Sequence, residues 1–383
     1  MRSGTPSRRR AVRRRRAVAL GLVAGLAAGA FALGVALGKG SDGAAAPPPP
    51  VASTLPARLL AGERLIAGVP GTRVPPRLRA AIRRGELAGV VLFAESFPSR
   101  AAGRRLIAEL QRIPRPAKLR EPLLVMVDQE GGQVKRLAGA PTASAREMGE
   151  RGPAFSRRQG RRTAANLRQV GVNVDLAPVL DVARPDGVIA ATERGFGSSA
   201  AAVAANAVPF AAGLEAGGVA ATGKHFPGFG AARENTDFAS QRIGLSKARL
   251  RAVDEVPFRR FIAAGGELVM LSTAIYPAFS GKPAAFARPL ATGELRGRLG
   301  FEGVSLTDAL QTAAVADFGG PRKAALAAVR AGTDLLLFTD LSTAAAVRRA
   351  LAARLRSGSL NRAEFEAAAQ RVLDLRASLG GRT

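Results

Sequence analysis

The sequence predicts an α/β protein, a (β/α)8 barrel of the TIM type preceded by an N-terminal transmembrane or signal helix. Eight short apolar runs recur along the chain, amphipathic stretches rich in Ala, Arg and Leu separate them, and about 320 residues are available for eight such units. Runs that are apolar along their whole length suit strands buried on both faces of a parallel sheet. A doubly wound open sheet is the alternative. It would carry a glycine-rich phosphate loop, and neither 195–197 nor 228–230 supplies the third glycine of that pattern.

The apolar runs and the stretches between them give the order of the elements within one domain, residues 58–383. The predicted strands are 64–69, 89–93, 123–128, 173–181, 219–226, 268–273, 303–308 and 334–338. The predicted helices include 76–84, 101–113, 156–170, 200–213, 253–264 and 321–331.

The first 38 residues differ in composition from the rest of the chain. Residues 1–16 hold eight arginines and no acid, and residues 17–38 form a run of 22 residues without a charge. As a helix that run would span roughly 33 Å, close to the thickness of a bilayer core. Arginines before an apolar run predict that the start of the chain stays in the cytoplasm and the rest is exported. An uncleaved anchor and a cleaved signal peptide both fit, and the length of the run favours the anchor.

The expected location follows from this segment. Residues 39–57, which include the proline run 47–50, are predicted to be an extended linker. The domain is therefore expected outside the cytoplasm, either secreted or held at the membrane by residues 17–38.

The single histidine, His225, and the absence of cysteine exclude several chemistries. No disulfide, thiolate nucleophile or zinc–thiolate site can form, and a multi-histidine metal site is impossible. A Ser-His-Asp triad would have to use His225. Carboxylates, lysines and arginines must therefore carry most of any catalysis.

The charge of the chain is strongly positive. The formal net charge is +28, and residues 1–50 hold nine basic residues and one acid, so about +20 belongs to the remainder. This excess fits an arginine-rich composition alone, or attraction to anionic surfaces such as cell-wall polymers or lipid head groups. Nucleic acid is not an expected partner, because aromatic residues make up only 5% and no nucleic-acid-binding motif is recognisable.

Polar residues stand at the ends of four predicted strands. They are Asp128, Asp181, the pair Lys224 and His225, and Asp308. In a barrel the carboxyl ends of the strands surround one mouth, where active sites lie. One acid in such a position is often a helix cap, but acids and a Lys-His pair on four strands favour a functional site.

Four segments resemble motifs of glycoside hydrolase family 3. Residues 127–136 (VDQEGGQVKR) are similar to that family's DQEGG-x-V-x-R stretch, and residues 224–228 to its KHFPG motif. Residues 194–197 resemble its R-x-F-G segment, and 299–308 its LGF-x-G strand with the nucleophilic Asp. The resemblance covers about residues 58–380 and is greatest to single-domain bacterial β-N-acetylhexosaminidases.

The resemblance implies a retaining glycosidase that acts on β-linked N-acetylhexosaminides of the cell wall. Asp308 would be the nucleophile that forms a covalent glycosyl-enzyme. No metal or organic cofactor is implied, and the partner is a carbohydrate. The resemblance implies that the sugar in the −1 subsite is bound by Asp128, Arg136, Arg194, Lys224 and His225. Asp181 is a further candidate for binding the sugar, with a strand-end cap as the alternative.

The loop after the fifth strand departs from the family pattern. The hexosaminidases carry D-x-H there, whereas this chain has Glu234-Asn235-Thr236-Asp237, with Asn235 at the Asp position and Asp237 at the His position. Three alternatives follow: Asp237 is the acid/base, Glu234 is the acid/base, or the loop is inactive. The third would make the chain a glycan-binding envelope protein on the same barrel. An enzyme with another sugar preference is a further alternative.

Overall fold

The computed structural model describes residues 49–382. The predicted segments 1–16 and 17–38, and the linker up to residue 48, lie outside this range. Among the described residues, no helix is both long enough and apolar enough to cross a bilayer.

The folded unit begins at Pro50, earlier than the predicted boundary at residue 58. Residues 51–54 form a short 3₁₀ helix, η1, and Ala52 and Leu55 are buried. The Ala52 N–H donates a hydrogen bond to Gln370 Oε1 at 3.0 Å. Residues 50–57 were expected to belong to the linker, and in the structure their buried apolar side chains pack against the last helix of the domain.

Eight parallel strands form one sheet in the order β7-β6-β5-β4-β3-β2-β1-β8. Their bounds are Leu65–Gly68, Gly89–Val91, Leu124–Val127, Val174–Asp175, Ala220–Phe226, Leu268–Leu271, Val304–Thr307 and Leu336–Phe338, for β1 to β8 in turn. The two outer strands of this order also approach each other, because Leu306 bridges to Leu335 and the Thr307 N–H donates to the Leu335 carbonyl at 3.0 Å. The sheet is thus a nearly closed parallel barrel, which confirms the predicted fold and excludes the open sheet.

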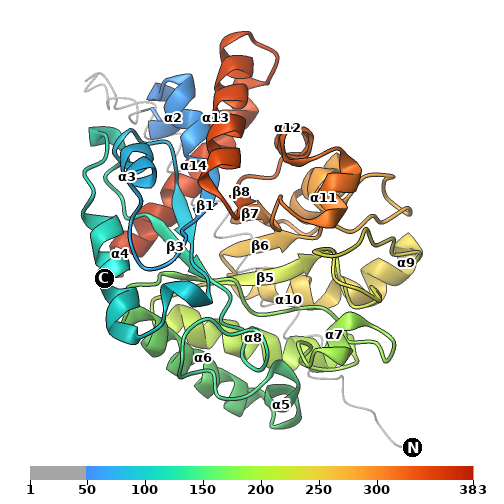
Figure 1. Ribbon diagram of the computed structural model, residues 1–383. Coiled ribbons are helices and arrows are strands. Elements are labelled where there is room, and N and C mark those ends of the chain that lie inside the picture. The colour runs from blue at the N-terminus through green and yellow to red at the C-terminus, as the bar shows by residue number, and fades with distance from the viewer. Residues whose placement is uncertain (1–48, 383) are drawn as a thin grey trace, which may run out of the picture. The chain divides into compact units, whose positions relative to one another are not determined.

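Helices surround the strands in chain order, as the colours of Figure 1 show. The α-helices are α2 Ala57–Gly62, α3 Pro76–Arg83, α4 Arg100–Arg112, α5 Ala145–Glu150, α6 Pro153–Arg168, α7 Val188–Ala191, α8 Ala200–Ala216, α9 Lys247–Arg249, α10 Val256–Ala263, α11 Ala313–Phe318, α12 Pro321–Ala331, α13 Leu341–Arg356 and α14 Arg362–Gly380. Further 3₁₀ helices are η2 Ala94–Ser96, η3 Ala117–Leu119 and η5 Ala284–Phe286, and π-helices are η4 Leu250–Asp254 and η6 Pro289–Arg298.

Strand β4 is much shorter than predicted. It covers Val174–Asp175 instead of residues 173–181, and the chain returns to the sheet only where Val179 bridges to Lys224. Pro178 lies between these two points and has no N–H to donate to a neighbouring strand, so it interrupts the ladder.

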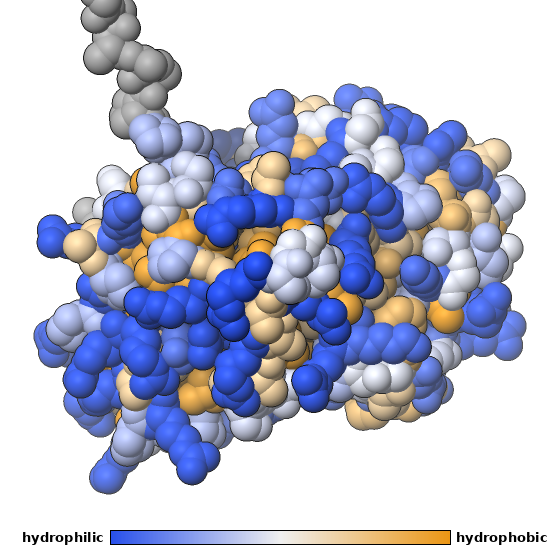
Figure 2. Space-filling model, turned by 90° about the horizontal axis from the view of Figure 1, so that it is seen from above, coloured by the Kyte–Doolittle hydropathy of each residue, from blue (hydrophilic) through white to orange (hydrophobic). Residues whose placement is uncertain are grey.

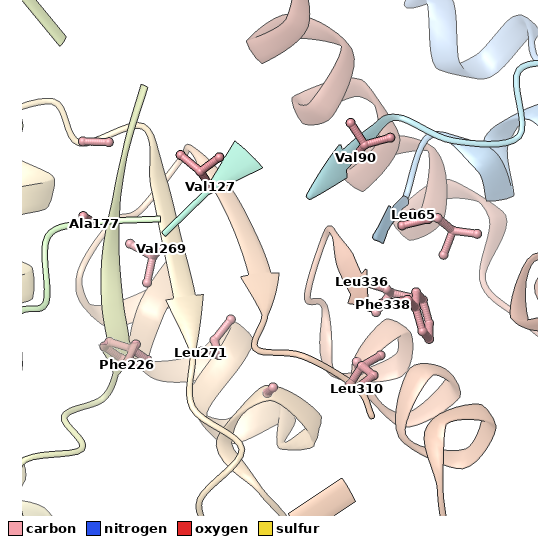
Figure 3. Close-up of a cluster of buried hydrophobic side chains, with 14 of the residues drawn as sticks. Leu65, Val90, Val127, Ala177, Phe226, Val269, Leu271, Leu310, Leu336 and Phe338 are labelled. Atoms are coloured by element: carbon pink, nitrogen blue, oxygen red, sulfur yellow. The ribbon is translucent and has the colours of Figure 1, made fainter. Parts of the chain in front are cut away.

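Side chains along the strands alternate between two buried sets. The inner set fills the barrel and includes Ile66, Val91, Leu124, Met126, Val174, Leu176, Ala220, Leu268, Met270, Val304, Leu306 and Leu337. The outer set packs against the helices and includes Leu65, Val90, Val127, Val269, Leu271, Leu336 and Phe338, which Figure 3 labels. Leu375 and Leu379 of α14 belong to the inner set, so this helix covers one end of the barrel. Because the side-chain period of a strand is two, the same alternation decides which residues at the strand ends point into the mouth.

The outer surface is mainly polar. Hydrophilic side chains cover most of the face seen in Figure 2, and apolar side chains show mainly in the hollows between them. Among the described residues, the exposed large hydrophobic side chains are Val51 and Phe238, with 41% and 74% of their surface accessible.

Candidate active site

A cavity of about 340 Å³ opens at the carboxyl ends of the strands. Inner-set side chains such as Met270 and Leu337 line it together with polar groups. The polar and charged residues that line it are Asp128, Glu130, Arg136, Arg194, Lys224, His225, Asn235, Asp237, Asp308, Gln311, Thr312 and Thr339. An apolar cavity with a few converging polar groups is the usual form of a small-molecule site.

Strand alternation brings three of these groups into the mouth. On β3, Leu124 and Met126 belong to the inner set, and Asp128 continues that alternation just past the strand end. On β7, Val304 and Leu306 belong to the inner set, and Asp308 continues their alternation just past the strand end. Lys224 occupies the corresponding position on β5, four residues after Ala220 of the inner set.

A chain of ion pairs joins the groups on one side of the cavity. Lys224 Nζ lies 2.8 Å from Asp128 Oδ1 and 2.7 Å from Glu130 Oε1. Arg194 binds Glu130 through two hydrogen bonds of 2.8 Å, and Arg136 Nη2 lies 3.3 Å from Asp128 Oδ2. The side chains of Lys224 and Glu130 are only 2% and 3% exposed, so these charges are held away from water.

The ion pairs fix the protonation states of this cluster. Burial alone would raise the pKa of Glu130, but Arg194 and Lys224 outweigh it and hold the pKa well below its usual range. Burial opposes ionisation of Asp128 too, and Lys224 and Arg136 lower its pKa. Burial disfavours the cation of Lys224, but Asp128 and Glu130 raise its pKa. Near neutral pH the cluster is therefore fully ionised.

Asp181 lies behind His225 and does not line the cavity, so the prediction that it binds the sugar is not supported. Its carboxylate is fully buried and accepts hydrogen bonds from the His225 N–H at 3.2 Å and the Phe229 N–H at 2.6 Å. Its other oxygen lies 2.8 Å from His225 Nδ1, which donates because a carboxylate can only accept. Asp181 thus orients the His225 ring, which lines the cavity.

Asp308 lies at the end of β7 with its carboxylate at the cavity. Its Oδ1 accepts a hydrogen bond from the Ala309 N–H at 2.7 Å, and its own N–H donates to the Leu271 carbonyl at 3.3 Å. No cationic side chain forms an ion pair with it in the described part of the chain, so its second oxygen is free to face a ligand.

Asp237 reaches the same cavity from the loop after β5. Its N–H donates to Asn235 Oδ1 at 3.1 Å, and Asn235 Nδ2 donates to Asp237 Oδ2 at 2.8 Å. Backbone hydrogen bonds fix this turn, because the Ala313 and Ala314 N–H groups donate to the carbonyls of Asp237 and Thr236 at 3.2 Å each. Burial and then the negative charge of Asp308 raise the pKa of Asp237, although Asn235 acts in the opposite direction.

Glu234 is exposed and does not line the cavity. The structure therefore brings Asp128, Arg136, Arg194, Lys224, His225, Asp237 and Asp308 together and leaves out Glu234 and Asp181.

Glu130 is a residue of the site that the sequence reasoning missed. It stands in the quoted DQEGG stretch, two residues beyond Asp128, and the signal that could have identified it was this spacing past the strand end. Gln311 and Thr312 were missed as well. Gln311 is held by Asp340 Oδ2, to which its Nε2 donates at 2.6 Å, and by the Thr339 N–H at 2.9 Å. Both lie in the loop directly after β7, and loop residues leave no periodic signal in the sequence.

Residues 49–382 contain no group of three or more His, Cys, Asp or Glu side chains arranged to hold a metal ion. The acids of the cavity are instead paired with Lys224, Arg136 and Arg194, or stand alone.

Comparison with known families gives one extended match. Residues 65–375 match the model of the glycosyl hydrolase family 3 N terminal domain. The match begins at β1 and ends within α14, so it includes all eight strands and every residue of the cavity.

Two curated relatives are similar over most of their length. An uncharacterized secreted glycosyl hydrolase of Arthroderma benhamiae is 35% identical over 329 residues, which are 83% of this chain and 93% of the relative. A β-hexosaminidase of Xanthomonas campestris pv. campestris is 36% identical over 301 residues, 76% of this chain and 88% of the relative.

Solved structures of related enzymes are also similar to this chain over most of its length. The β-N-acetylhexosaminidase from Beutenbergia cavernae superposes with a TM-score of 0.78 at 31% identity, over 84% of this chain and 99% of that one. A glycoside hydrolase family 3 β-N-acetylglucosaminidase from Paenibacillus gives 0.79 at 31% identity and covers 85% of this chain, which spans only 63% of that longer protein.

Proposed function

The chain belongs to glycoside hydrolase family 3, whose members hydrolyse O-glycosyl bonds, and we propose that it is a retaining enzyme for β-linked N-acetylhexosaminides. The observation that carries the proposal is the joint presence of Asp308 and Asp237 in one cavity beside a fully ionised sugar-binding cluster. The curated and solved relatives named above support the choice of sugar.

The ionised cluster forms the −1 subsite of the proposal. Asp128 offers carboxylate oxygens to neighbouring sugar hydroxyls, and Arg194, Lys224 and His225 supply donors. Lys224 and Arg194 both bind the carboxylate of Glu130 through short contacts. These contacts hold the two cationic donors in position before the sugar arrives. A site whose polar groups are already oriented spends less binding energy on ordering them.

In the first step Asp308 attacks the anomeric carbon with one oxygen while Asp237 gives its proton to the glycosidic oxygen. The bond from carbon to the leaving oxygen breaks, and a covalent glycosyl-enzyme forms. In the second step ionised Asp237 takes a proton from water, whose oxygen attacks the same carbon and releases Asp308. Asp308 thus acts as the nucleophile, and Asp237 acts alternately as acid and base.

The acid/base role suits Asp237 better than Glu234. A general acid must hold a proton near the working pH, and burial together with the charge of Asp308 raises the pKa of Asp237. Both side chains are exposed at the surface, but Asp237 lines the cavity and Glu234 lies outside it. The fixed turn formed by Asn235 and the backbone of α11 keeps Asp237 in place.

A glycan-binding protein without activity is the second candidate. The hydrogen bond from Asn235 Nδ2 to Asp237 favours the ionised carboxylate, and an ionised carboxylate cannot donate a proton. If that contact dominates, the cavity would bind a sugar and not cleave it.

The biological setting is proposed from the sequence and one relative. Residues 1–38 have the pattern of an export signal or anchor, and the Arthroderma benhamiae relative is a secreted glycosyl hydrolase. We place the domain outside the cytoplasm, anchored or secreted, with a cell-wall glycan as its substrate.

The test compares the full chain with Asp308→Asn on aryl β-N-acetylglucosaminides and aryl β-glucosides. The proposal predicts turnover of the N-acetylglucosaminides and a loss of at least about a thousandfold in the variant, because the nucleophile is removed. Turnover of the glucosides alone would show a different sugar preference. Binding of N-acetylglucosamine without any turnover would support the second candidate.

A further inference from the structure

We propose that the face of the barrel opposite the mouth carries a second site, an arginine-lined cavity that binds a phosphate-bearing anion. The cavity has a volume of about 570 Å³. It lies where Pro122, Asn173 and Gly218 lead into β3, β4 and β5, which is the amino end of these strands. The ends of α4 and α14 close its sides, and Figure 1 shows these two helices next to each other.

Positive charge converges on this cavity and is only partly compensated by nearby acids. Five arginines line it and no carboxylate does: Arg104, Arg115, Arg120, Arg168 and Arg382. Among these five, only Arg382 forms an ion pair in residues 49–382, with Glu267. Arg168 donates to backbone carbonyls, and the side chains of Arg104 and Arg120 have no hydrogen-bond or ion-pair partner in the described chain. An anion bound here would relieve repulsion among four unpaired guanidinium groups.

Arg115 is the innermost of these cations and has unused donor capacity. Its Nη2 donates to the Arg120 carbonyl at 3.0 Å, while its Nε is buried and has no acceptor. Burial and the nearby Arg376 lower its pKa to about 10, opposed by Glu63 and Glu121. Glu63 is already paired with Arg376, so it leaves the charge of Arg115 largely unmatched.

The side chains that line the cavity indicate which class of ligand it would bind. Guanidinium groups match phosphate oxygens with paired donors, and several of them around one cavity suit a phosphate ester. The floor is apolar, formed by buried Ile107, Val172 and Leu379. A phosphate with an apolar or glycerol-like body therefore fits both parts of the cavity. A phospholipid head group and a soluble phosphate ester share this chemistry.

The site is independent of the glycosidase proposal. Its residues lie on α4, α6 and α14 and on the segments that lead into the strands, whereas the catalytic cavity lies at the carboxyl ends of the strands. No residue lines both cavities. Binding at the arginine cavity can therefore be measured whether or not the chain cleaves glycosides.

The test is calorimetric titration of the full chain with inorganic pyrophosphate at constant ionic strength. The variant Arg104→Gln/Arg120→Gln removes two exposed charges whose side chains form no hydrogen bond or ion pair within residues 49–382. We expect its affinity to fall about tenfold or more, since each charge-assisted contact contributes on this scale. The matched control is Arg259→Gln/Arg260→Gln, which removes two exposed charges on α10 and should bind as the parent does. Equal affinity in all three proteins, or equal loss in both variants, would overturn the proposal.

A second arm identifies the source of the phosphate. The three full-length proteins are sedimented with phosphatidylcholine vesicles that contain or lack phosphatidylglycerol. A loss of phosphatidylglycerol-dependent sedimentation confined to Arg104→Gln/Arg120→Gln would support a lipid head group as ligand. Unchanged sedimentation combined with weakened pyrophosphate binding would support a soluble phosphate ester.

Discussion

Asp237 and Asp308 line one cavity, and the negative charge of Asp308 adds to burial in raising the pKa of Asp237. Retaining glycosidases commonly use two carboxyl groups in this way, one ionised and one able to carry a proton. The relationship matters here because the only imidazole in the chain, His225, belongs to the KHFPG motif and has its Nδ1 bound to the buried Asp181. A carboxyl group is therefore the available acid/base.

Replacing Asp237 by Asn should reduce cleavage according to the leaving group. With a poor leaving group such as an alkyl or sugar alcohol, kcat should fall by about 10² to 10⁴, the usual contribution of general acid catalysis. With dinitrophenol, which needs no proton, the glycosylation step should be nearly unchanged. Steady-state kinetics over a series of aryl and alkyl glycosides measures this. Glu234→Gln is the matched control. If the loss of kcat depends on the leaving group in Glu234→Gln and not in Asp237→Asn, Asp237 is not the general acid.

Replacing Asn235 by Ala should move the basic limb of the pH–rate profile to higher pH. Asn235 donates to the carboxylate of Asp237 and so favours its ionised form, which lowers the pKa. Without this donor the pKa of Asp237 rises, and the protonated acid persists to higher pH before activity is lost. Asn235→Asp should move the limb in the same direction, because it adds a like charge. A limb that stays in place or moves to lower pH in both variants would argue against Asp237 as the acid.

Replacing Lys224 by Met should destabilise the fold as well as the site. Asp128 and Glu130 would each lose a short contact to a cation in a buried setting. Breaking a buried ion pair on one side costs about 3–5 kcal/mol. Urea unfolding followed by circular dichroism gives the free energy of unfolding. Lys282→Met, at an exposed lysine, is the control and should stay within about 0.5 kcal/mol of the parent.

The same ion pairs predict a pH dependence of stability. The pKa values of Glu130 and Asp128 are lowered in the folded protein. Their contribution is therefore present above the pKa values of the unfolded chain and is lost as pH falls through the folded values. The free energy of unfolding should fall with decreasing pH in the acid range, and the slope should be smaller in Glu130→Gln. An equal slope in the two proteins would contradict this account.

Phe238 should contribute to binding of the leaving group. It is 74% exposed and follows Asp237, which lines the cavity, directly in the chain. A sugar ring stacked on it would gain about 0.5–1.5 kcal/mol, so Phe238→Ala should lower kcat/KM for a disaccharide about three- to tenfold. Hydrolysis of a glycosyl fluoride, whose leaving group has no ring, should be unchanged. Val51→Ala, at the other exposed large apolar side chain, is the control, and a uniform loss on both substrates would refute the assignment.

The barrel could be predicted because its strands carry a strong signal. Runs such as 268–273 and 303–308 hold only apolar or small uncharged residues before Asp308, and β6 and β7 lie within them. The prediction failed where a single residue acts against the pattern, as Pro178 does in β4. The packing of Ala52 and Leu55 near α14 could not be predicted either, because the proline-rich composition of this segment is typical of a linker.

The site could be predicted where the family motifs fall at the strand ends. Asp128, Lys224 and Asp308 are examples, since strand alternation places each of them at the cavity. The place of Asp181 could not be predicted, because a strand-end acid can point into the cavity or behind a neighbour, and only the three-dimensional structure distinguishes the two. The position of Glu234 relative to Asp237 depends on a turn whose backbone is held by α11, far away in sequence.

Mass spectrometry of a trapped glycosyl-enzyme tests the central claim most directly. The full chain is incubated with a 5-fluoro analogue of N-acetylglucosaminyl fluoride, digested with trypsin and sequenced by fragmentation, with Asp308→Asn treated in parallel. We expect the mass of one sugar residue on Asp308, within the tryptic peptide 299–322, and no label in the variant. Turnover of the parent with a label on another residue, or with no label under conditions that inactivate it, would contradict Asp308 as the nucleophile.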